Sequence, residues 1–334
     1  MKDFRIGKRI ISRKTPPLVI AEACINHNGS LAKAIQLVNA AVNAGAECIK
    51  FHTHIVDKEM IPTNIRPGNI SREKQWDIVK RCQLSEKEEK RLKTYCDSKK
   101  IMYLSTPFSR EAADRLFKLG VPAFKIGSGE CANLPLLEHI AKKRIPIILS
   151  TGMHSVSSIK KSVALLRTYG VPFMLMHTVS LYPTPYSKVC LGAIKQLHDQ
   201  FRVPVGLSDH SLGIYTSLAA VACGAVVLEK HFTVSTSWPG PDNAFSIEPN
   251  DLKHLILGSN AVWQAIQGNK TVYADEKPIM DFAFASVVST KLIAKGERLS
   301  SDNIWVKRPG TGDFKASDFY RLCGKKAQRV IAAE

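Results

Sequence analysis

Short apolar runs alternate with segments of helical periodicity along the first 231 residues of this chain. Each run ends in, or is closely followed by, a residue whose side chain can take part in chemistry. The eight runs occupy residues 18–23, 48–52, 101–106, 123–130, 146–151, 173–178, 203–210 and 226–231. Strand and helix alternating eight times predict a (β/α)8 TIM barrel of the α/β class. Catalytic groups of such barrels lie at the carboxyl ends of the strands, so the function is to be sought there.

Signals at the ends of the periodic segments support this reading. Ser30 and Ser109 each precede a segment with helical spacing, and similar signals occur at 155–170 and 249–268. Serine is a preferred N-cap residue because its hydroxyl accepts a hydrogen bond from the first helical turn. The connection at 57–71 is rich in proline and glycine and too long for a minimal strand-to-helix link. We therefore predict a functional loop over the barrel mouth there.

The pattern changes after Gly268. Residues 269–280 are polar and lose the helical period, whereas 281–334 show short alternating strands separated by turns. We predict a catalytic barrel domain at 1–268, a linker at 269–280 and a small β-rich domain at 281–334. A domain of this size has a marginal core. We expect it to pack on another surface, in its own chain or in a partner.

Net charge is the main compositional feature that bears on function. The chain has 334 residues, with 47 Lys and Arg against 29 Asp and Glu, and a formal net charge of +18. This surplus could attract a polyanion. The basic residues are scattered over predicted helices and no basic strand is interleaved with aromatic residues, as it would be in an RNA-binding sheet. We expect a solvated basic surface that steers an anionic substrate, and no nucleic-acid partner.

Cysteine spacing and apolar content bear on location. The eight cysteines form no CxxC pair, and several lie in or beside apolar runs. Reduced thiols there behave as small hydrophobic groups, which predicts a cytoplasmic protein. The basic N-terminus lacks the apolar stretch of a signal peptide, and no run approaches the ~20 apolar residues of a membrane span. We expect neither export nor membrane insertion.

Two histidines follow neighbouring predicted strands. His210 and His231 come at the ends of the seventh and eighth strands, so the fold brings both imidazoles to one rim. Two neutral imidazoles with open positions suit a divalent metal that acts as a Lewis acid. The alternative is a pair of rim histidines that hydrogen-bond to backbone.

Two lysines also end apolar strands, although burying an unpaired ammonium group is costly. These are Lys50 and Lys125, and hydroxyl side chains follow the same set of strands at Thr106, Ser128, Ser150 and Ser208. Point charges with hydroxyl donors suit a phosphate or carboxylate group. The alternatives are a Schiff-base lysine and lysines that only extend their ammonium groups to the rim.

Three carboxylates, Glu22, Glu130 and Glu229, lie at predicted strand ends. Each could act as a general acid or base, or could pair with a neighbouring lysine. We rank Glu130 first because it lies on a glycine-flanked turn beside Ser128 and Lys125.

Sequence motifs along nearly the whole chain point to one family. They are AEACINHNGS, KFHTHIV, PGN, STPFSR, KIGSGEC, STGM, YPTP, GLSDH, EKHFT, GPD, DFAFASVV and NIWVKRPG. In these motifs and their order, the chain closely resembles the bacterial sialic acid synthases, whose C-terminal part is an antifreeze-protein-like (SAF) domain.

The resemblance implies a reaction and a cofactor. Phosphoenolpyruvate (PEP) condenses with an N-acetylated aldehyde sugar to give a nine-carbon 2-keto acid and phosphate. A divalent metal polarises the sugar carbonyl; Mn²⁺ is the expected ion, with Mg²⁺ and Co²⁺ as alternatives. The family's metal ligands fall on His210 and His231.

The resemblance also assigns the remaining site residues. The catalytic set is Glu130, as the acid/base that manages the attacking water, with Glu22 and His231. The positions that bind PEP in the family match Lys50, Thr106, Lys125, Ser128, Ser150, Ser180 and Ser208. The positions that surround the sugar in the family match His52, Asn69, Tyr182, Asp242, Phe282 and Arg308. In the family, the small domain crosses to the other subunit of a swapped homodimer, so Arg308 would complete the partner's site.

Departures from the family pattern bear on the sugar. His52 replaces a usual glutamine and Ser180 a usual asparagine, and the chain stops earlier than we expect of a complete small domain, as if truncated. The leading interpretation is an N-acetylneuraminate synthase that uses N-acetylmannosamine. The alternatives are a legionaminate-type synthase that uses a 2,4-diacetamido-trideoxy sugar and, from another class, a non-catalytic polyanion-binding protein.

Overall fold

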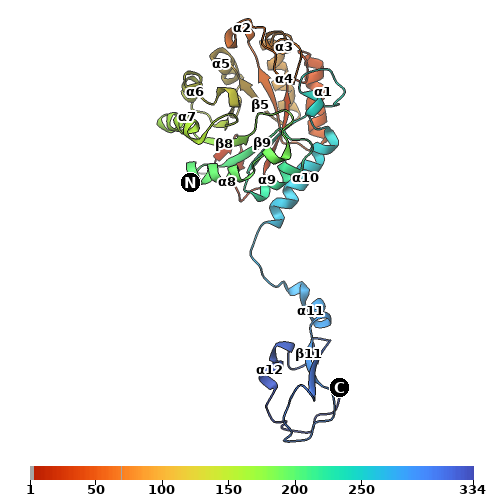
Figure 1. The fold of residues 1–334 in the computed structure, drawn as a ribbon. Helices are drawn as coiled ribbons and strands as arrows, with labels where there is room; N and C mark the ends of the chain where they lie inside the picture. The colour runs from red at the N-terminus through yellow and green to blue at the C-terminus, as the bar shows by residue number, and fades with distance from the viewer. Residues whose placement is uncertain (1–3, 69) are drawn as a thin grey trace. The chain divides into compact units, whose positions relative to one another are not determined.

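The computed structural model describes residues 4–68 and 70–334. It divides into two compact units, Met1–Gln267 and Gly268–Glu334 (Figure 1).

The first unit is built around a parallel sheet of eight strands. In sequence order they are β3 (Leu18–Cys24), β4 (Cys48–Thr53), β5 (Met102–Pro107), β6 (Phe124–Ile126), β7 (Ile147–Ser150), β8 (Phe173–Thr178), β9 (Val205–Asp209) and β10 (Val227–His231). Their order in the sheet is β5-β4-β3-β10-β9-β8-β7-β6, and the two end strands, β5 and β6, lie against each other. The sheet is therefore a closed barrel, and the predicted (β/α)8 fold is confirmed.

Helices surround this sheet in Figure 1. They are α1 (Leu31–Asn43), α2 (Val56–Glu59), α3 (Gln75–Cys82), α4 (Glu86–Ser98), α5 (Arg110–Lys118), α6 (Leu134–Ala141), α7 (Val156–Thr168), α8 (Gly192–Phe201), α9 (Tyr215–Ala222) and α10 (Pro249–Ala265). The hydroxyls of Ser30, Ser109 and Ser155 accept backbone hydrogen bonds at the starts of α1, α5 and α7, as their positions in the sequence predict.

Strand residues alternate between two apolar clusters, because successive side chains of a strand point to opposite faces. Val19, Ala21 and Ala23 belong to the large cluster that includes helix residues. Leu18 and Ile20 belong to a smaller one inside the barrel. This inner cluster also includes side chains of the hairpin β1 (Phe4–Ile6) and β2 (Arg9–Ile11). We call it the inner plug; its full membership is Phe4, Ile6, Ile11, Leu18, Ile20, Cys48, Leu104, Ala123, Ile148, Met174, Met176, Val226 and Val227.

The second unit contains a short antiparallel pair, β11 (Ser286–Ser289) and β12 (Ile304–Lys307), and the helix α12 (Phe319–Leu322). Its core consists of Ile293, Leu299, Ile304, Phe319 and Ala327. The region predicted as a linker holds a 3₁₀ turn (Ala274–Glu276) and the start of α11 (Lys277–Ala283).

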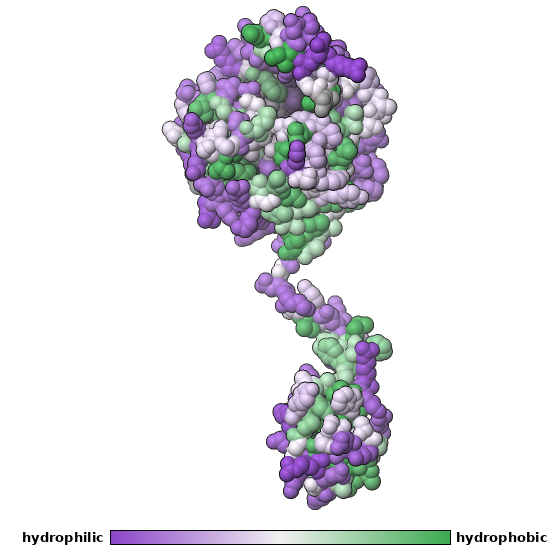
Figure 2. Space-filling view, viewed as in Figure 1, coloured by the Kyte–Doolittle hydropathy of each residue, from purple (hydrophilic) through white to green (hydrophobic). Residues whose placement is uncertain are grey.

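The surface is of mixed polarity, and Figure 2 shows apolar patches between hydrophilic side chains on the visible face of each unit. Within the described residues, no helix is long and apolar enough to cross a membrane. All eight cysteines are free, and Cys24, Cys48, Cys82, Cys96 and Cys131 are buried. This agrees with their interpretation as small hydrophobic groups, although Cys24 proves to be a special case.

Candidate active site

A cavity of about 500 Å³ opens at the carboxyl ends of the barrel strands. Thirteen of the residues predicted from the sequence line it: Glu22, Lys50, His52, Thr106, Lys125, Ser128, Ser150, Ser180, Tyr182, Ser208, His210, His231 and Asp242. Pro67 and Ile70 also line it. The long connection at 57–71 therefore reaches the barrel mouth, as predicted.

Within the described residues of the barrel unit, one predicted residue does not line this cavity. Glu130 lies on the 3₁₀ turn Ser128–Glu130 after β6, where its Oε2 accepts a hydrogen bond from Asn133 Nδ2 at 2.5 Å, and it is absent from the cavity lining. Its assignment as the acid/base that manages the attacking water stays a prediction. Phe282 and Arg308 belong to the second unit, where both are exposed. Asn69 lies outside the described residues.

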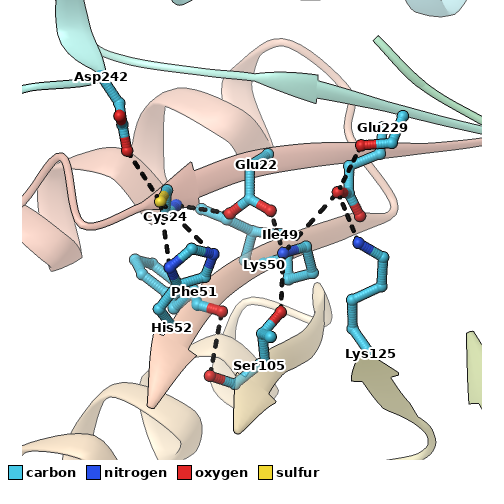
Figure 3. A network of polar contacts seen from close by, with 12 residues as sticks. Glu22, Cys24, Ile49, Lys50, Phe51, His52, Ser105, Lys125, Glu229 and Asp242 are labelled. Atoms are coloured by element: carbon cyan, nitrogen blue, oxygen red, sulfur yellow. Dashed lines mark hydrogen bonds and ion pairs between the residues drawn. The ribbon is translucent and has the colours of Figure 1, made fainter. Parts of the chain in front are cut away.

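A buried network of two lysines and two glutamates lies in the cavity (Figure 3). Lys50 forms an ion pair with Glu22 and its Nζ lies 3.9 Å from Glu229 Oε1. Lys125 Nζ donates to the same Glu229 oxygen at 2.9 Å. Strand register explains the proximity, because Glu22 is directly opposite Lys50 on β4. The four side chains are at most 5% exposed, so their charges interact through protein rather than water.

Burial and neighbouring charges act differently on these four groups. Burial raises the pKa of Glu22 to about 7, against the opposing effect of Lys50. Burial alone would lower the pKa of Lys50, but Glu22 and Glu229 together raise it to about 12. Lys125 and Lys50 outweigh burial at Glu229 and lower its pKa. Glu22 can therefore exchange a proton near neutral pH, while Glu229 stays ionised as the counter-ion of the lysines.

Hydroxyl groups line the same cavity as the two lysines. Lys50 Nζ donates to Thr106 Oγ1 at 3.1 Å, and Ser208 Oγ donates to Glu229 Oε1 at 3.2 Å. The Oγ of Ser128 accepts from the Gly152 amide at 3.0 Å. Ser150 Oγ is buried without a hydrogen-bond partner among the described residues. Such donors beside two ammonium groups suit an anion that carries phosphate or carboxylate oxygens.

The two predicted metal ligands lie close together. The rings of His210 and His231 have centroids 5.4 Å apart, and Tyr182 lies 4.1 Å from the His210 ring. His210 Nδ1 lies 2.8 Å from the carbonyl of Val179, so as a donor it leaves Nε2 for another partner. His231 Nδ1 is buried and has no hydrogen-bond partner in the described structure. Burial lowers the pKa of His210 to about 4 and that of His231 well below its usual range. Both rings are thus neutral, the form that binds a metal, and they fit a divalent cation.

Two cavity residues were given too little weight from the sequence. Glu229 is one of the three candidate carboxylates and ranks below Glu130 from the sequence. It lies two residues before His231 on β10, so both side chains are on the strand face that lines the cavity. Cys24 was treated as a small hydrophobic group, yet its Sγ lies 3.0 Å from Asp242 Oδ2. Its period-two spacing from Glu22 is the signal that points to it.

Comparison with known proteins places this site in a family. The profile of the NeuB family matches residues 37–271, and that of the SAF domain matches 284–333. The chain is 38% identical to N,N'-diacetyllegionaminic acid synthase of Campylobacter jejuni over 93% of this chain and 96% of that protein. It is 31% identical to human N-acetylneuraminate-9-phosphate synthase over 95% of this chain and 90% of that protein.

A solved structure is similar as well. The N-acetylneuraminic acid synthetase of Leptospira borgpetersenii, crystallised with citrate, is 32% identical and aligns with a TM-score of 0.76. The alignment covers 84% of this chain and 95% of that one. The predicted resemblance is confirmed: the chain belongs to the NeuB family of sialic-acid-type synthases, which condense PEP with a sugar and form a carbon–carbon bond.

Proposed function

We propose that this chain joins PEP to an N-acetylated sugar that carries two acetamido groups, and so makes a legionaminate-type nine-carbon acid. The observation that carries the assignment of the site is the buried Lys50–Glu22–Lys125–Glu229 network with its surrounding hydroxyls. It supplies cations for an anionic substrate and a carboxyl group that titrates near neutral pH.

PEP binding falls to the lysines and the hydroxyls. Lys50 and Lys125 would pair with the phosphate and carboxylate oxygens, and Ser150, whose buried hydroxyl lacks a partner, would donate to one of them. Bound in this way, PEP would keep its methylene carbon toward the cavity mouth, where the sugar aldehyde enters.

Proton transfer falls to Glu22 in this proposal. Water must add to the former PEP carbon before phosphate leaves, so a base must accept a proton from that water. Glu22 lines the cavity and has a pKa of about 7, whereas Glu130 is absent from its lining. Glu229 would keep both lysines protonated and in place.

A divalent ion, expected to be manganese from the resemblance, would be held by His210 and His231 and would polarise the sugar carbonyl. Tyr182 packs against both imidazoles and would fix their orientation.

Two observations favour the diacetamido sugar. The chain is more similar to the legionaminate synthase than to the N-acetylneuraminate-9-phosphate synthase. His52 and Ser180, which depart from the pattern of the N-acetylneuraminate enzymes, both line the cavity. N-Acetylmannosamine is the second candidate, supported by the likeness to the Leptospira N-acetylneuraminic acid synthetase.

The test is phosphate release from PEP with each sugar and with none, in the presence of Mn²⁺ and with or without chelator. We expect chelator-sensitive release that is faster with the 2,4-diacetamido-trideoxy sugar. Preference for N-acetylmannosamine would replace the proposed sugar with the second candidate. Release independent of any sugar would refute the condensation itself.

A further inference from the structure

The backbone at Cys24 has a conformation that cysteine rarely adopts. Cys24 has φ of +46°, in the left-handed region, and the β3–β4 register is irregular between Glu22 and Cys24. A side chain in this region costs on the order of 1–3 kcal/mol, and such strain persists where the surrounding structure enforces it, often at functional sites. A glycine would fit this backbone without strain. The thiol is therefore carried at a position that favours residues without a side chain.

The thiol lies among potential metal ligands (Figure 3). Its Sγ donates to Asp242 Oδ2 at 3.0 Å and lies 3.3 Å from His52 Nδ1. Two triads of ligand atoms, each within 4.8 Å of one another, include it: Cys24 with His231 and Asp242, and Cys24 with Glu22 and His52. Tetrahedral ligands at about 2.0–2.3 Å from an ion lie about 3.5 Å apart, so small side-chain movements would close either triad around one.

The two triads differ in how free their donors are. Glu22 is already engaged, since one carboxylate oxygen pairs with Lys50 and the other accepts from the Cys24 amide at 2.7 Å. In the other triad, His231 is 8% exposed and its Nδ1 has no partner among the described residues. The only side-chain hydrogen bond described for the Asp242 carboxylate comes from the Cys24 thiol itself. In the triad of Cys24, His231 and Asp242, the ligand atoms are therefore less engaged with other partners than those of Glu22.

Charge balance favours the same triad. An ion with charge +2 held only by two neutral imidazoles would add that charge to a buried site in which Glu22 and Glu229 already pair with the two lysines. A thiolate and a carboxylate cancel it. Binding would release the thiol proton to solvent, since the thiolate is the form that ligates.

We propose that Cys24 and Asp242 join the two histidines, His210 and His231, as ligands of the catalytic divalent ion, so that this chain has a thiolate-containing metal site. The inference rests on the proposed function in one respect, namely that the site holds a divalent ion. It shifts the expected metal, because thiolate ligands favour zinc and other softer ions over manganese. Asp242 thereby changes from the predicted sugar contact to a metal ligand.

The test uses the full-length protein, freed of metal by a chelator and titrated with Co²⁺ in the absence of substrates. A thiolate bound to Co²⁺ gives a charge-transfer band in the near ultraviolet, which nitrogen and oxygen ligands do not give. We expect this band in the wild type and its loss in Cys24→Gly, which relieves the left-handed strain and should fold. Cys190→Gly is the matched control, because Cys190 is also left-handed, with φ of +53°, but is exposed and outside the cavity lining.

Zinc gives an independent measure. In the wild-type protein, X-ray absorption should show a sulfur ligand at about 2.3 Å from bound Zn²⁺. The Zn²⁺ dissociation constant should rise about tenfold or more in Cys24→Gly, since loss of even an outer-shell partner costs about 10–100-fold. Absence of stoichiometric metal binding, metal bound without sulfur, or a band that survives in Cys24→Gly would each overturn the proposal. These readouts need no sugar, so they stand or fall separately from the substrate assignment.

Discussion

Removing the charge of Glu229 tests whether the buried network behaves as the structure implies. Glu229→Gln keeps the shape of the side chain but leaves Lys125 without the carboxylate that lies 2.9 Å away, and Lys50 with Glu22 alone. Opposite charges at about 4 Å interact by roughly 4 kcal/mol at an effective dielectric constant of about 20. Loss of one partner from a buried pair costs about 3–5 kcal/mol. We take about 3 kcal/mol, because Lys50 keeps a partner.

For a domain of this size, about 3 kcal/mol lowers the melting temperature by roughly 6–12 °C, measured by circular dichroism without substrates. Asp97→Asn is the control: Asp97 pairs with Lys93 at 2.7 Å but is 60% exposed, so its loss should cost no more than about 1 kcal/mol. PEP should raise the melting temperature more in Glu229→Gln than in the wild type, because it supplies the missing negative charge. Equal melting temperatures for Glu229→Gln and Asp97→Asn would refute the reasoning.

Two further predictions concern the PEP hydroxyls and the second unit. An added Cβ at Gly152 would lie 2.5 Å from Ser180 Oγ and 2.8 Å from Ser128 Oγ, so Gly152→Ala should displace both hydroxyls. We expect KM for PEP to rise about tenfold, equivalent to one charge-assisted hydrogen bond, and an unchanged KM would count against the PEP assignment. If Arg308 completes the partner's site, mixing Arg308→Ala with Lys125→Met should restore turnover at low sugar concentration. Mixing Lys125→Met with Glu229→Gln should not restore turnover, because both changes lie in the barrel. Equal turnover in the two mixtures would show that Arg308 does not complete the partner's site.

The barrel and most of its site could be predicted from the sequence because both depend on period-two alternation. Glu22, Lys50 and Ser150 each follow an apolar residue of the inner plug by two positions, and the strand places their side chains on the same face, toward the cavity. The alternation does not predict where the Glu130 side chain lies, because this residue is beyond the end of β6, on a 3₁₀ turn.

Other features depended on tertiary structure. The left-handed backbone of Cys24 coincides with the register irregularity between β3 and β4, which the local sequence does not predict. The pairing of Cys24 with Asp242 joins residues 218 positions apart. Arg308 and Phe282 were assigned to the sugar by resemblance alone, and this assignment stays a prediction.

The inner plug has a consequence for proton traffic. Its apolar side chains, including those of the hairpin β1–β2, fill the barrel interior beneath the charged network. Hydrocarbon offers protons no relay, so we expect water and hydronium to reach Glu22 from the side of the mouth and not through the described residues of the inner plug. A sugar bound at that mouth would therefore restrict proton exchange between the cavity and solvent. In each turnover, the proton that is removed from the attacking water would then leave with the phosphate or with the new acid.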